Sequence, residues 1–147
     1  MYLTDQPISA SDFLSRQPDE SCGAVASFIG VVRSHEEECR VKGLYYDSYS
    51  SMAEKAIRSI IDEVKGRYEA HEIRVLHRVG WLEVGEVAVA ITVTAPHRNE
   101  AFAAVRAVVD QIKERVPIWK KEVYADGTSE WMRCDDPAEL IHEARRH

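Results

Sequence analysis

The sequence predicts an α+β fold, with a mixed or antiparallel sheet packed against helices. Short apolar and β-branched runs, which are typical of strands, intermix with longer segments of helical periodicity. These segments do not follow the regular strand–helix–strand repeat of a parallel sheet. With 147 residues, of which 45% are hydrophobic, the chain is long enough to bury one core, so we expect residues 1–147 to form a single domain.

The first segments along the chain are predicted to be a short helix and two strands. Residues 9–16 carry serine and aspartate in their first turn, which favours a helix N-terminus. Residues 22–32 are mostly small or β-branched, as in a buried strand. After a polar loop over residues 33–40, residues 44–49 alternate in polarity and predict a second strand.

A second helix is expected to follow these strands. Ser51 and Glu54 have the spacing of a capping box, in which each side chain satisfies a backbone N–H group of the other residue. The helix is expected to end near Gly66. Its apolar positions recur at helical spacing, and they are Ala53, Ile57, Ile60, Ile61 and Val64.

The second half of the chain is expected to add one long helix and three strands. Pro117 ends the helix, because proline has no backbone N–H and disfavours helical geometry in the residue before it. Pro137 is placed in the first turn of a C-terminal helix. The long helix covers residues 99–115, with an apolar stripe of Phe102, Val105, Val109 and Ile112; the strands are 73–79, 87–93 and 119–124, with a turn region at 80–85.

The charge and composition exclude several classes of protein. The formal net charge of −6 argues against non-specific nucleic-acid binding, which needs a broad basic face. No apolar run approaches the ~20 residues of a membrane helix, and the N-terminus lacks the pattern of a secretory signal. We therefore expect a cytoplasmic protein that acts on neither nucleic acid nor membrane.

The sequence predicts no metal site, disulfide framework or bound cofactor. Its three cysteines, Cys22, Cys39 and Cys134, are widely spaced and form no Cys-x-x-Cys pair. Cys22 opens an apolar run and is interpreted as a small buried hydrophobic residue. His142 and His147 do not have the spacing of a two-histidine zinc helix.

Cationic side chains gather at the ends of the predicted elements, against the negative net charge of the chain. A helix N-terminus presents free N–H groups, and arginine offers a planar fork that matches phosphate or carboxylate oxygens. The cations are Arg33 at the end of the first strand, His97 and Arg98 before the long helix, Lys113 in its last turn, and Lys120 and Lys121 after the proline.

Each of these cations also has an ordinary explanation. The helix dipole alone favours a lysine in the last turn of a helix, and lysines at a strand edge discourage aggregation. Taken together, they suggest an anion-binding site. If they converge, the neighbouring positive charges would help one lysine to lose its proton and act as a general base or nucleophile.

A set of motifs spread over residues 23–131 resembles the large, catalytic subunit of molybdopterin synthase. No single motif is diagnostic, but the ordered set is highly specific. The motifs are Phe28-x-Gly30-x-Val32-Arg33, Tyr46-x-x-Tyr49-x-x-Met52-Ala53-x-Lys55, His77-Arg78-x-Gly80-x-Leu82, His97-Arg98-x-x-Ala101-Phe102 and Val116-Pro-Ile-Trp-Lys-Lys-Glu122, with Lys113 shortly before the last.

The resemblance implies a sulfur-transfer reaction. Members of this family move two sulfurs from the C-terminal Gly-Gly thiocarboxylate of a small ubiquitin-like carrier subunit to cyclic pyranopterin monophosphate, which forms the dithiolene of molybdopterin. A dimer of catalytic subunits with one carrier at each end makes a heterotetramer. The family fold combines a hammerhead-like α/β part with a small β subdomain, and no cofactor is implied.

Residue by residue, the resemblance implies catalytic roles for Lys113 and Lys120. One would act as acid and base at the pterin carbons, or as a transient covalent partner, and the other would orient the thiocarboxylate; the assignment stays open. The phosphate-bearing pterin and the thiocarboxylate are both anions, which fits the collected cations. Substrate binding is implied for Val31, Val32, Arg33, His97, Arg98, Lys113, Lys120, Lys121 and Glu122.

Two other interpretations remain open. A non-catalytic module could dock a ubiquitin-like or acidic C-terminal tail in the same basic cleft without any turnover. An unrelated enzyme, such as a phosphosugar lyase that forms a Schiff base on Lys113, is a weaker alternative. Turnover of the pterin substrate with a thiocarboxylated carrier would distinguish the synthase from both.

Overall fold

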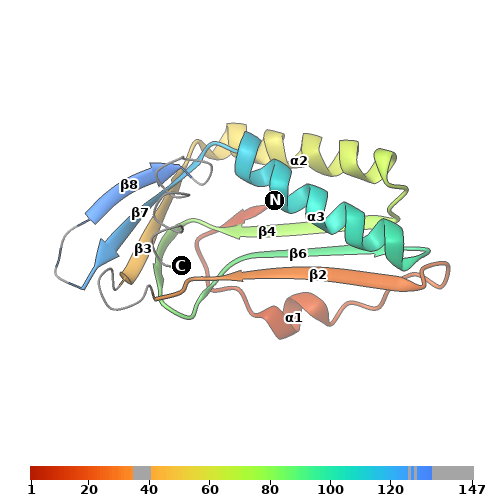
Figure 1. The fold of residues 1–147 in the computed structure, drawn as a ribbon, viewed down its shortest axis with the longest axis horizontal. Helices are drawn as coiled ribbons and strands as arrows, with labels where there is room; N and C mark the ends of the chain where they lie inside the picture. The colour runs from red at the N-terminus through yellow and green to blue at the C-terminus, as the bar shows by residue number, and fades with distance from the viewer. Residues whose placement is uncertain (35–40, 126, 128, 134–147) are drawn as a thin grey trace.

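The computed structural model describes residues 1–34, 41–125, 127 and 129–133, and it shows two four-stranded sheets. We call the first the helix-covered sheet and the second, which lies at one end of it, the end sheet (Figure 1). The helix-covered sheet has the order β1 (Leu3–Thr4), β4 (Glu72–Arg78), β6 (Val87–Ala95), β2 (Ala24–Val31). The end sheet has the order β5 (Gly80–Glu83), β3 (Val41–Ser48), β7 (Ile118–Tyr124), β8 (Ser129–Arg133).

The expected α+β class is confirmed. β1 pairs with β4 in parallel and the other pairs of the helix-covered sheet are antiparallel, so that sheet is mixed. The pairs of the end sheet are all antiparallel. Two long helices, α2 (Ser50–Arg67) and α3 (Arg98–Arg115), cover one face of the helix-covered sheet, and the short α1 (Ala10–Leu14) lies against the other (Figure 1). In the part of the chain that the structure describes, no helix has the length and apolarity needed to cross a membrane.

Helix α2 buries the stripe that its sequence predicts. All five of its apolar positions pack into the main core against strands β4 and β6. Full burial of an aliphatic side chain contributes about 1.5–3 kcal/mol, so this stripe is a large part of what holds the helix on the sheet. The buried residues are Ala53, Ile57, Ile60, Ile61 and Val64.

The predicted capping box at the start of α2 is wrong. The helix begins at Ser50, so Ser51 lies inside its first turn, and the cap residue Tyr49 makes no side-chain cap bond. The Glu54 carboxylate instead accepts hydrogen bonds from the backbone N–H groups of Tyr2 and Leu3, at 2.9 Å each. A tertiary partner therefore takes the carboxylate that the local pattern assigned to the cap, and it ties β1 to the helix.

Helix α3 buries a stripe shifted from the predicted one. Phe102 is 65% exposed, and only Ile112 of the predicted stripe is buried. Alanine, which scores low in a search for large apolar residues, allows the helix backbone to approach the sheet closely. Ala101 packs with Ala26 and Ala95 of the sheet in a separate small cluster. The residues that face the sheet are Ala101, Ala104, Val108 and Ile112.

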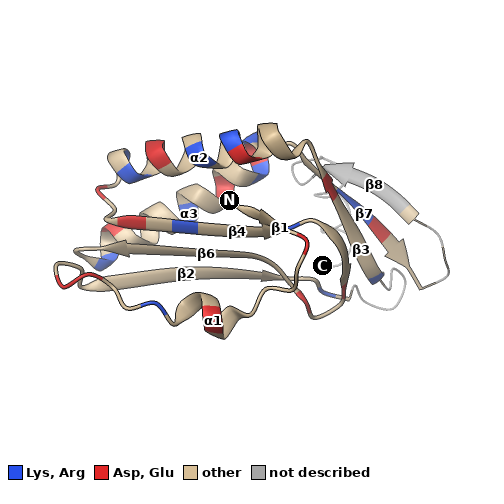
Figure 2. Ribbon diagram, turned by 180° about the vertical axis from the view of Figure 1, so that it is seen from behind, with Lys and Arg blue, Asp and Glu red and all other residues tan. Residues whose placement is uncertain are grey.

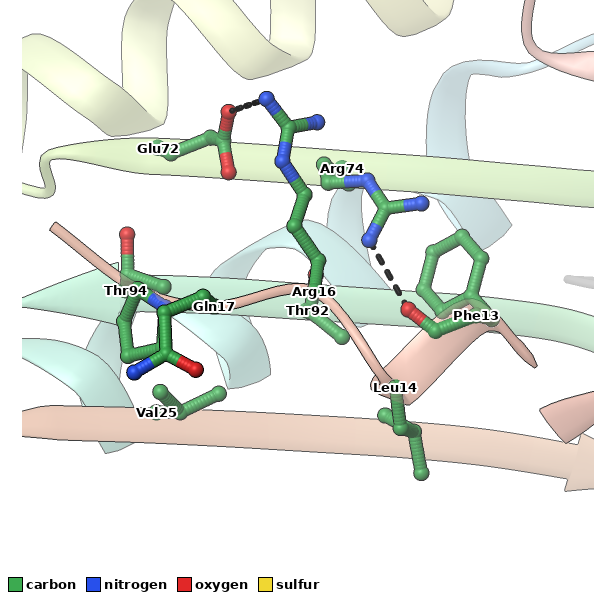
Figure 3. Close-up of a pocket in the computed structure, with 10 residues that line it drawn as sticks. Phe13, Leu14, Arg16, Gln17, Val25, Glu72, Arg74, Thr92 and Thr94 are labelled. Atoms are coloured by element: carbon green, nitrogen blue, oxygen red, sulfur yellow. Dashed lines mark hydrogen bonds and ion pairs between the residues drawn. The ribbon is translucent and has the colours of Figure 1, made fainter. Parts of the chain in front are cut away.

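Helix α1 is held by side-chain contacts on the other face of the sheet (Figure 3). As predicted, Ser9 caps it and accepts a bond from the Asp12 N–H at 3.3 Å. The Arg74 guanidinium donates to the Phe13 carbonyl at 2.8 Å and lies 4.3 Å from the centre of the Phe13 ring. The enclosed space between α1 and the sheet is about 20 Å³, which admits about one water molecule and no substrate.

The end sheet contains two strands that the sequence does not predict, β5 and β8. The sequence predicts a turn region over residues 80–85, but these residues include β5, whose Leu82 is fully buried. A four-residue run carries too little periodicity to be distinguished from a turn. Gly43 of β3 allows the Trp81 ring to lie against its backbone, since a Cβ there would be 2.4 Å from a ring carbon. The expected helix at Pro137 and most of the loop at 33–40 lie outside the described residues.

Candidate functional site

Lys113 and Lys120 lie on either side of the passage from α3 into β7, with Lys120 in the end sheet itself. Lys113 is exposed in the last turn of α3, and the Lys120 side chain is 15% exposed in β7. The chain between them is fixed on both sides of the proline, because Val116 and Ile118 are both buried in the main core. The break at Pro117 therefore sets the direction of the strand that carries Lys120.

Lys120 is paired with a buried carboxylate. Its Nζ atom lies 3.9 Å from Oε1 of Glu122, whose residue surface is only 2% exposed. Residues two apart on a strand share a face, so the two side chains lie on the same side of the end sheet. A buried carboxylate is costly without a partner, and Lys120 supplies one. Figure 2 shows the basic and acidic positions next to each other on β7.

Glu122 therefore acts on Lys120 in the structure. Substrate binding by Glu122, which the resemblance implies, stays a prediction; in the structure its carboxylate is buried and contacts the Lys120 ammonium. Lys121 points to the opposite face of the end sheet from Lys120, since adjacent residues on a strand alternate. Its position opposite Tyr45 in β3 places it outside the Lys120–Glu122 pair.

A neutral histidine, His77, lies near Lys120 at the junction of the two sheets, with Tyr46 between them. Tyr46 is opposite Lys120 in β3, and its ring meets the His77 ring edge to face at 5.0 Å. Burial lowers the pKa of His77 to about 4, although the 2.7 Å hydrogen bond between its Nδ1 and the Arg78 carbonyl opposes the shift. His77 is therefore uncharged at neutral pH, with Nδ1–H as the donor.

Arg78 joins the two sheets beside this histidine. Its buried guanidinium donates to the Glu86 carboxylate at 3.0 Å and to the Trp81 carbonyl at 3.0 Å. Two hydrogen bonds to the Glu86 carboxylate lower its pKa. The larger effect comes from the Glu83 backbone N–H, and the next from the Arg78 guanidinium. These bonds fix the direct passage of the chain from β4 into β5.

Arg33 lies just after the end of β2, where the chain leaves the helix-covered sheet at the same junction. The preceding Val32 is buried with end-sheet residues. Its N–H donates a hydrogen bond to the Glu86 carbonyl at 2.9 Å, and its carbonyl accepts one from the Gly85 N–H at 2.7 Å. Val32 therefore contributes packing, whereas Val31 and Arg33 are exposed. We call Arg33, Lys113, Lys120 and Glu122 the junction group.

His97 and Arg98 lie at the opposite end of the molecule, so the predicted convergence of all the cations within one chain is wrong. His97 caps α3 and Arg98 begins it, whereas Lys113 lies in its last turn. The helix has 18 residues, and a helix of that length is about 27 Å long and does not fold back on itself. The His97 Nδ1 lies 3.8 Å from the Glu100 carboxylate. We call His97 and Arg98 the far group.

Known proteins share both the sequence pattern and this fold. The family described as MoaE protein matches residues 3–115. A Thermoplasma volcanium protein named molybdopterin synthase catalytic subunit is 40% identical over 129 residues, which cover 88% of this chain and 94% of that protein. The X-ray structure of molybdopterin synthase from Staphylococcus aureus has a TM-score of 0.82 and 35% identity, covering 89% of this chain and 95% of its own.

A more distant structure shows the same fold. It comes from a complex of subunits 1 and 2 of the Helicobacter pylori molybdopterin-converting factor, with a TM-score of 0.73, 16% identity and coverage of 90% of this chain and 89% of its own. At that identity the likeness concerns the fold alone. The family match, by contrast, spans well over half of the sequence and includes every helix described above. This chain therefore belongs to the MoaE protein family.

Proposed function

We propose that this chain is the catalytic subunit of a molybdopterin synthase, an enzyme of molybdenum cofactor biosynthesis that acts as a sulfurtransferase on cyclic pyranopterin monophosphate. The observation that carries the proposal is the Lys120 ammonium beside the buried Glu122 carboxylate, with Lys113 in the last turn of the helix that leads into the same strand. Arg33 follows Val32, which packs with end-sheet residues. The names of the relatives support the assignment as a molybdopterin synthase subunit. The cytoplasmic location expected from the sequence stays a prediction.

The chemistry of the reaction suits the junction group. Both the pterin phosphate and the thiocarboxylate are anions, so lysine and arginine bind them by charge-assisted hydrogen bonds. A partly buried lysine can hold or release a proton at the reacting carbon, and an exposed lysine can reach the carrier tail. In each transfer the thiocarboxylate sulfur forms a bond to a pterin carbon, while a carbon–oxygen bond at that carbon breaks and its oxygen leaves as water or on the phosphate. Water then cleaves the acyl–sulfur bond, which leaves the sulfur on the pterin and an ordinary carboxylate on the carrier.

A second copy of the chain would bring the far group to the junction group. β2 is the outer strand of its sheet and pairs, among the described strands, with β6 alone. Its eight residues include no proline and no charged residue, and the strand is accordingly free of blue and red in Figure 2. Outer strands usually carry charges or proline that prevent pairing with another chain. Three large apolar residues on this strand are exposed, namely Val25, Phe28 and Val31.

Pairing of two β2 strands across a twofold axis has a definite geometric result. In an antiparallel pair, the Val31 end of one strand lies beside the Ala24 end of the other. Within each chain, Ala24 pairs with Ala95 of β6, and the far group, His97 and Arg98, comes just after that strand. Arg33 of one copy would then lie near His97 and Arg98 of the other. The predicted anion site would be restored twice per homodimer, each time from two chains.

Mixing two inactive variants tests this composite site. Arg33→Ala and Arg98→Ala are each expected to abolish most activity alone, because each removes a phosphate-binding side chain from both sites. After subunit exchange, an equal mixture should recover about a quarter of wild-type activity, since half of the dimers are mixed and each has one intact site. The measurement is molybdopterin formation, with mixed dimers verified by native mass spectrometry.

The control mixture contains Arg33→Ala and the double variant Arg33→Ala/Arg98→Ala. No dimer in that mixture has an intact site, so no recovery is expected. If the first mixture forms mixed dimers and stays as inactive as the control, the two residues act within one chain or at different sites, and the composite site is wrong.

Reconstitution tests the function itself. The wild-type chain, incubated with cyclic pyranopterin monophosphate and a ubiquitin-like carrier ending in a Gly-Gly thiocarboxylate, is expected to form a dithiolene-containing pterin. The same carrier with a plain carboxylate is the control and should give none. Tight carrier binding without any product would favour the non-catalytic docking module. A borohydride-trapped adduct with phosphosugars, and none with the pterin, would favour the lyase.

A further inference from the structure

Three potential metal ligands lie together at the end of the helix-covered sheet that is remote from the lysines. Their ligand atoms, a carboxylate oxygen of Asp19, the Cys22 sulfur and a His71 ring nitrogen, all lie within 4.8 Å of one another. Among the described residues this is the one group of three or more such side chains. Asp19 and His71 are exposed and Cys22 is half-buried as a free thiol, so the group is open to solvent on one side.

The backbone holds these residues in place without a metal. The Cys22 N–H donates to the Asp19 carbonyl at 3.0 Å, which closes a turn between the two ligands. The next residue, Gly23, donates to the Pro96 carbonyl at 3.1 Å. His71 donates to the Thr94 carbonyl at 2.8 Å. Both ligand segments are thus fixed to adjacent positions at the end of β6.

The Asp19 carboxylate is oriented by a neighbour. The Ser21 hydroxyl and the Ser21 N–H both donate to Oδ2, the latter at 2.9 Å. The same hydroxyl first, and then the N–H, lower the pKa of Asp19, so the carboxylate is ionised at neutral pH. Bonds of this kind from an outer residue are what fixes a ligating carboxylate in known metal sites.

We propose that Asp19, Cys22 and His71 bind a zinc ion, with water as the fourth ligand. Zinc takes thiolate, imidazole and carboxylate at about 2.0–2.3 Å in tetrahedral geometry, which places the ligand atoms roughly 3.5 Å apart. The present ligand atoms lie within 4.8 Å of one another, so the proposed site needs side-chain rotations that bring them closer by roughly 1 Å. The thiolate and the carboxylate together neutralise the ion. Oxygen-seeking ions such as magnesium and calcium are disfavoured by the sulfur ligand.

Such a site would clamp two loops of the far end together. The turn before β2 and the loop between α2 and β4 would be joined through the metal, beside the segment that leads from β6 to His97. The alternative is that Asp19 serves only as a turn residue for Ser21, and that its proximity to the other two side chains is incidental. Metal titration separates the two.

The experiment titrates cobalt(II), a spectroscopic substitute for zinc, into a chain that keeps only one thiol. In the background Cys39→Ser/Cys134→Ser, one equivalent of cobalt is expected to produce thiolate-to-cobalt charge-transfer absorption, which one equivalent of zinc then abolishes. Adding Cys22→Ser should remove the absorption, and adding His71→Ala should weaken zinc binding at least about tenfold. Affinity should fall as the pH is lowered, because protons compete for the thiolate and the imidazole.

The matched control is Asp62→Asn, which removes an exposed carboxylate on α2 and should leave binding unchanged, whereas Asp19→Asn should weaken it. Circular dichroism verifies the fold of each variant. Absence of the charge-transfer band in the single-thiol chain would overturn the proposal. So would zinc affinity that is the same in His71→Ala, Asp19→Asn and the parent chain. Neither result depends on the proposed synthase activity.

Discussion

Replacement of Lys120 by alanine is expected to lower molybdopterin formation at least about a hundredfold, the contribution typical of a positioned acid or base. It should also destabilise the protein, because the buried Glu122 carboxylate loses the ammonium 3.9 Å away. Reconstituted turnover and thermal unfolding measure the two effects. The double variant Lys120→Met/Glu122→Gln separates them, since it should regain stability and stay inactive. Recovery of activity together with stability would show that Lys120 is structural.

Lys113 provides the complementary test, because its side chain is exposed and its removal leaves no buried charge behind. Lys113→Ala is expected to cause a loss of similar size without a change in the unfolding temperature. Lys65→Ala is the matched control, since Lys65 is also an exposed lysine in the last turn of a long helix. Full activity in both Lys113→Ala and Lys120→Ala would refute the catalytic assignment even though the family is correct.

The free energy of unfolding is expected to fall in mild acid because of His77. Its pKa is about 4 in the folded chain and 6.5 in the unfolded chain, so the unfolded state binds the proton more tightly. The His77 contribution is fully present above pH 6.5, decreases as the pH falls towards 4, and is then constant. The loss amounts to about 3 kcal/mol at the lower limit.

Urea unfolding at a series of pH values measures this loss. The variant His77→Phe keeps an aromatic ring beside Tyr46 and cannot be protonated. It should be somewhat less stable at neutral pH, because the bond to the Arg78 carbonyl is lost, but its stability should depend less on pH between 6.5 and 4. An identical pH dependence in both proteins would show that other groups cause the acid sensitivity.

The sequence predicts those parts of the fold in which side-chain size and periodicity agree. The α2 stripe is an example, since its large apolar residues are also the ones that face the sheet. In α3 the two signals separate: alanines face the sheet and Phe102 points away from the core, so a search for large residues selects the wrong face. Glu54 shows the same limit for capping, because its tertiary partners near Tyr2 cannot be read from local spacing.

The sequence predicts which residue types the candidate site contains, but it does not predict where those residues lie relative to one another. The sequence indicates the cations at element ends, but the length of α3 separates Arg98 from Lys113 in a way that only the direction of the helix reveals. The burial of Glu122 depends on the packing of the end sheet and has no local signal. The sequence does not indicate the Asp19, Cys22 and His71 group, because His71 is far from the other two residues in the sequence. The three come together because both segments are hydrogen-bonded to the same end of β6.

The order in which the strands enter the two sheets has a consequence for folding kinetics. From β2 to β7 the chain alternates between the sheets, so each sheet is built from segments that are interrupted by strands of the other. No cut in the chain would release either sheet as a fragment that folds alone. Contacts between such distant segments slow folding, because long loops must close before they gain any stabilisation. β7, the strand that carries Lys120, follows six of the other seven described strands along the chain, so we expect the Lys120–Glu122 pair to be assembled late and cooperatively with the other strands.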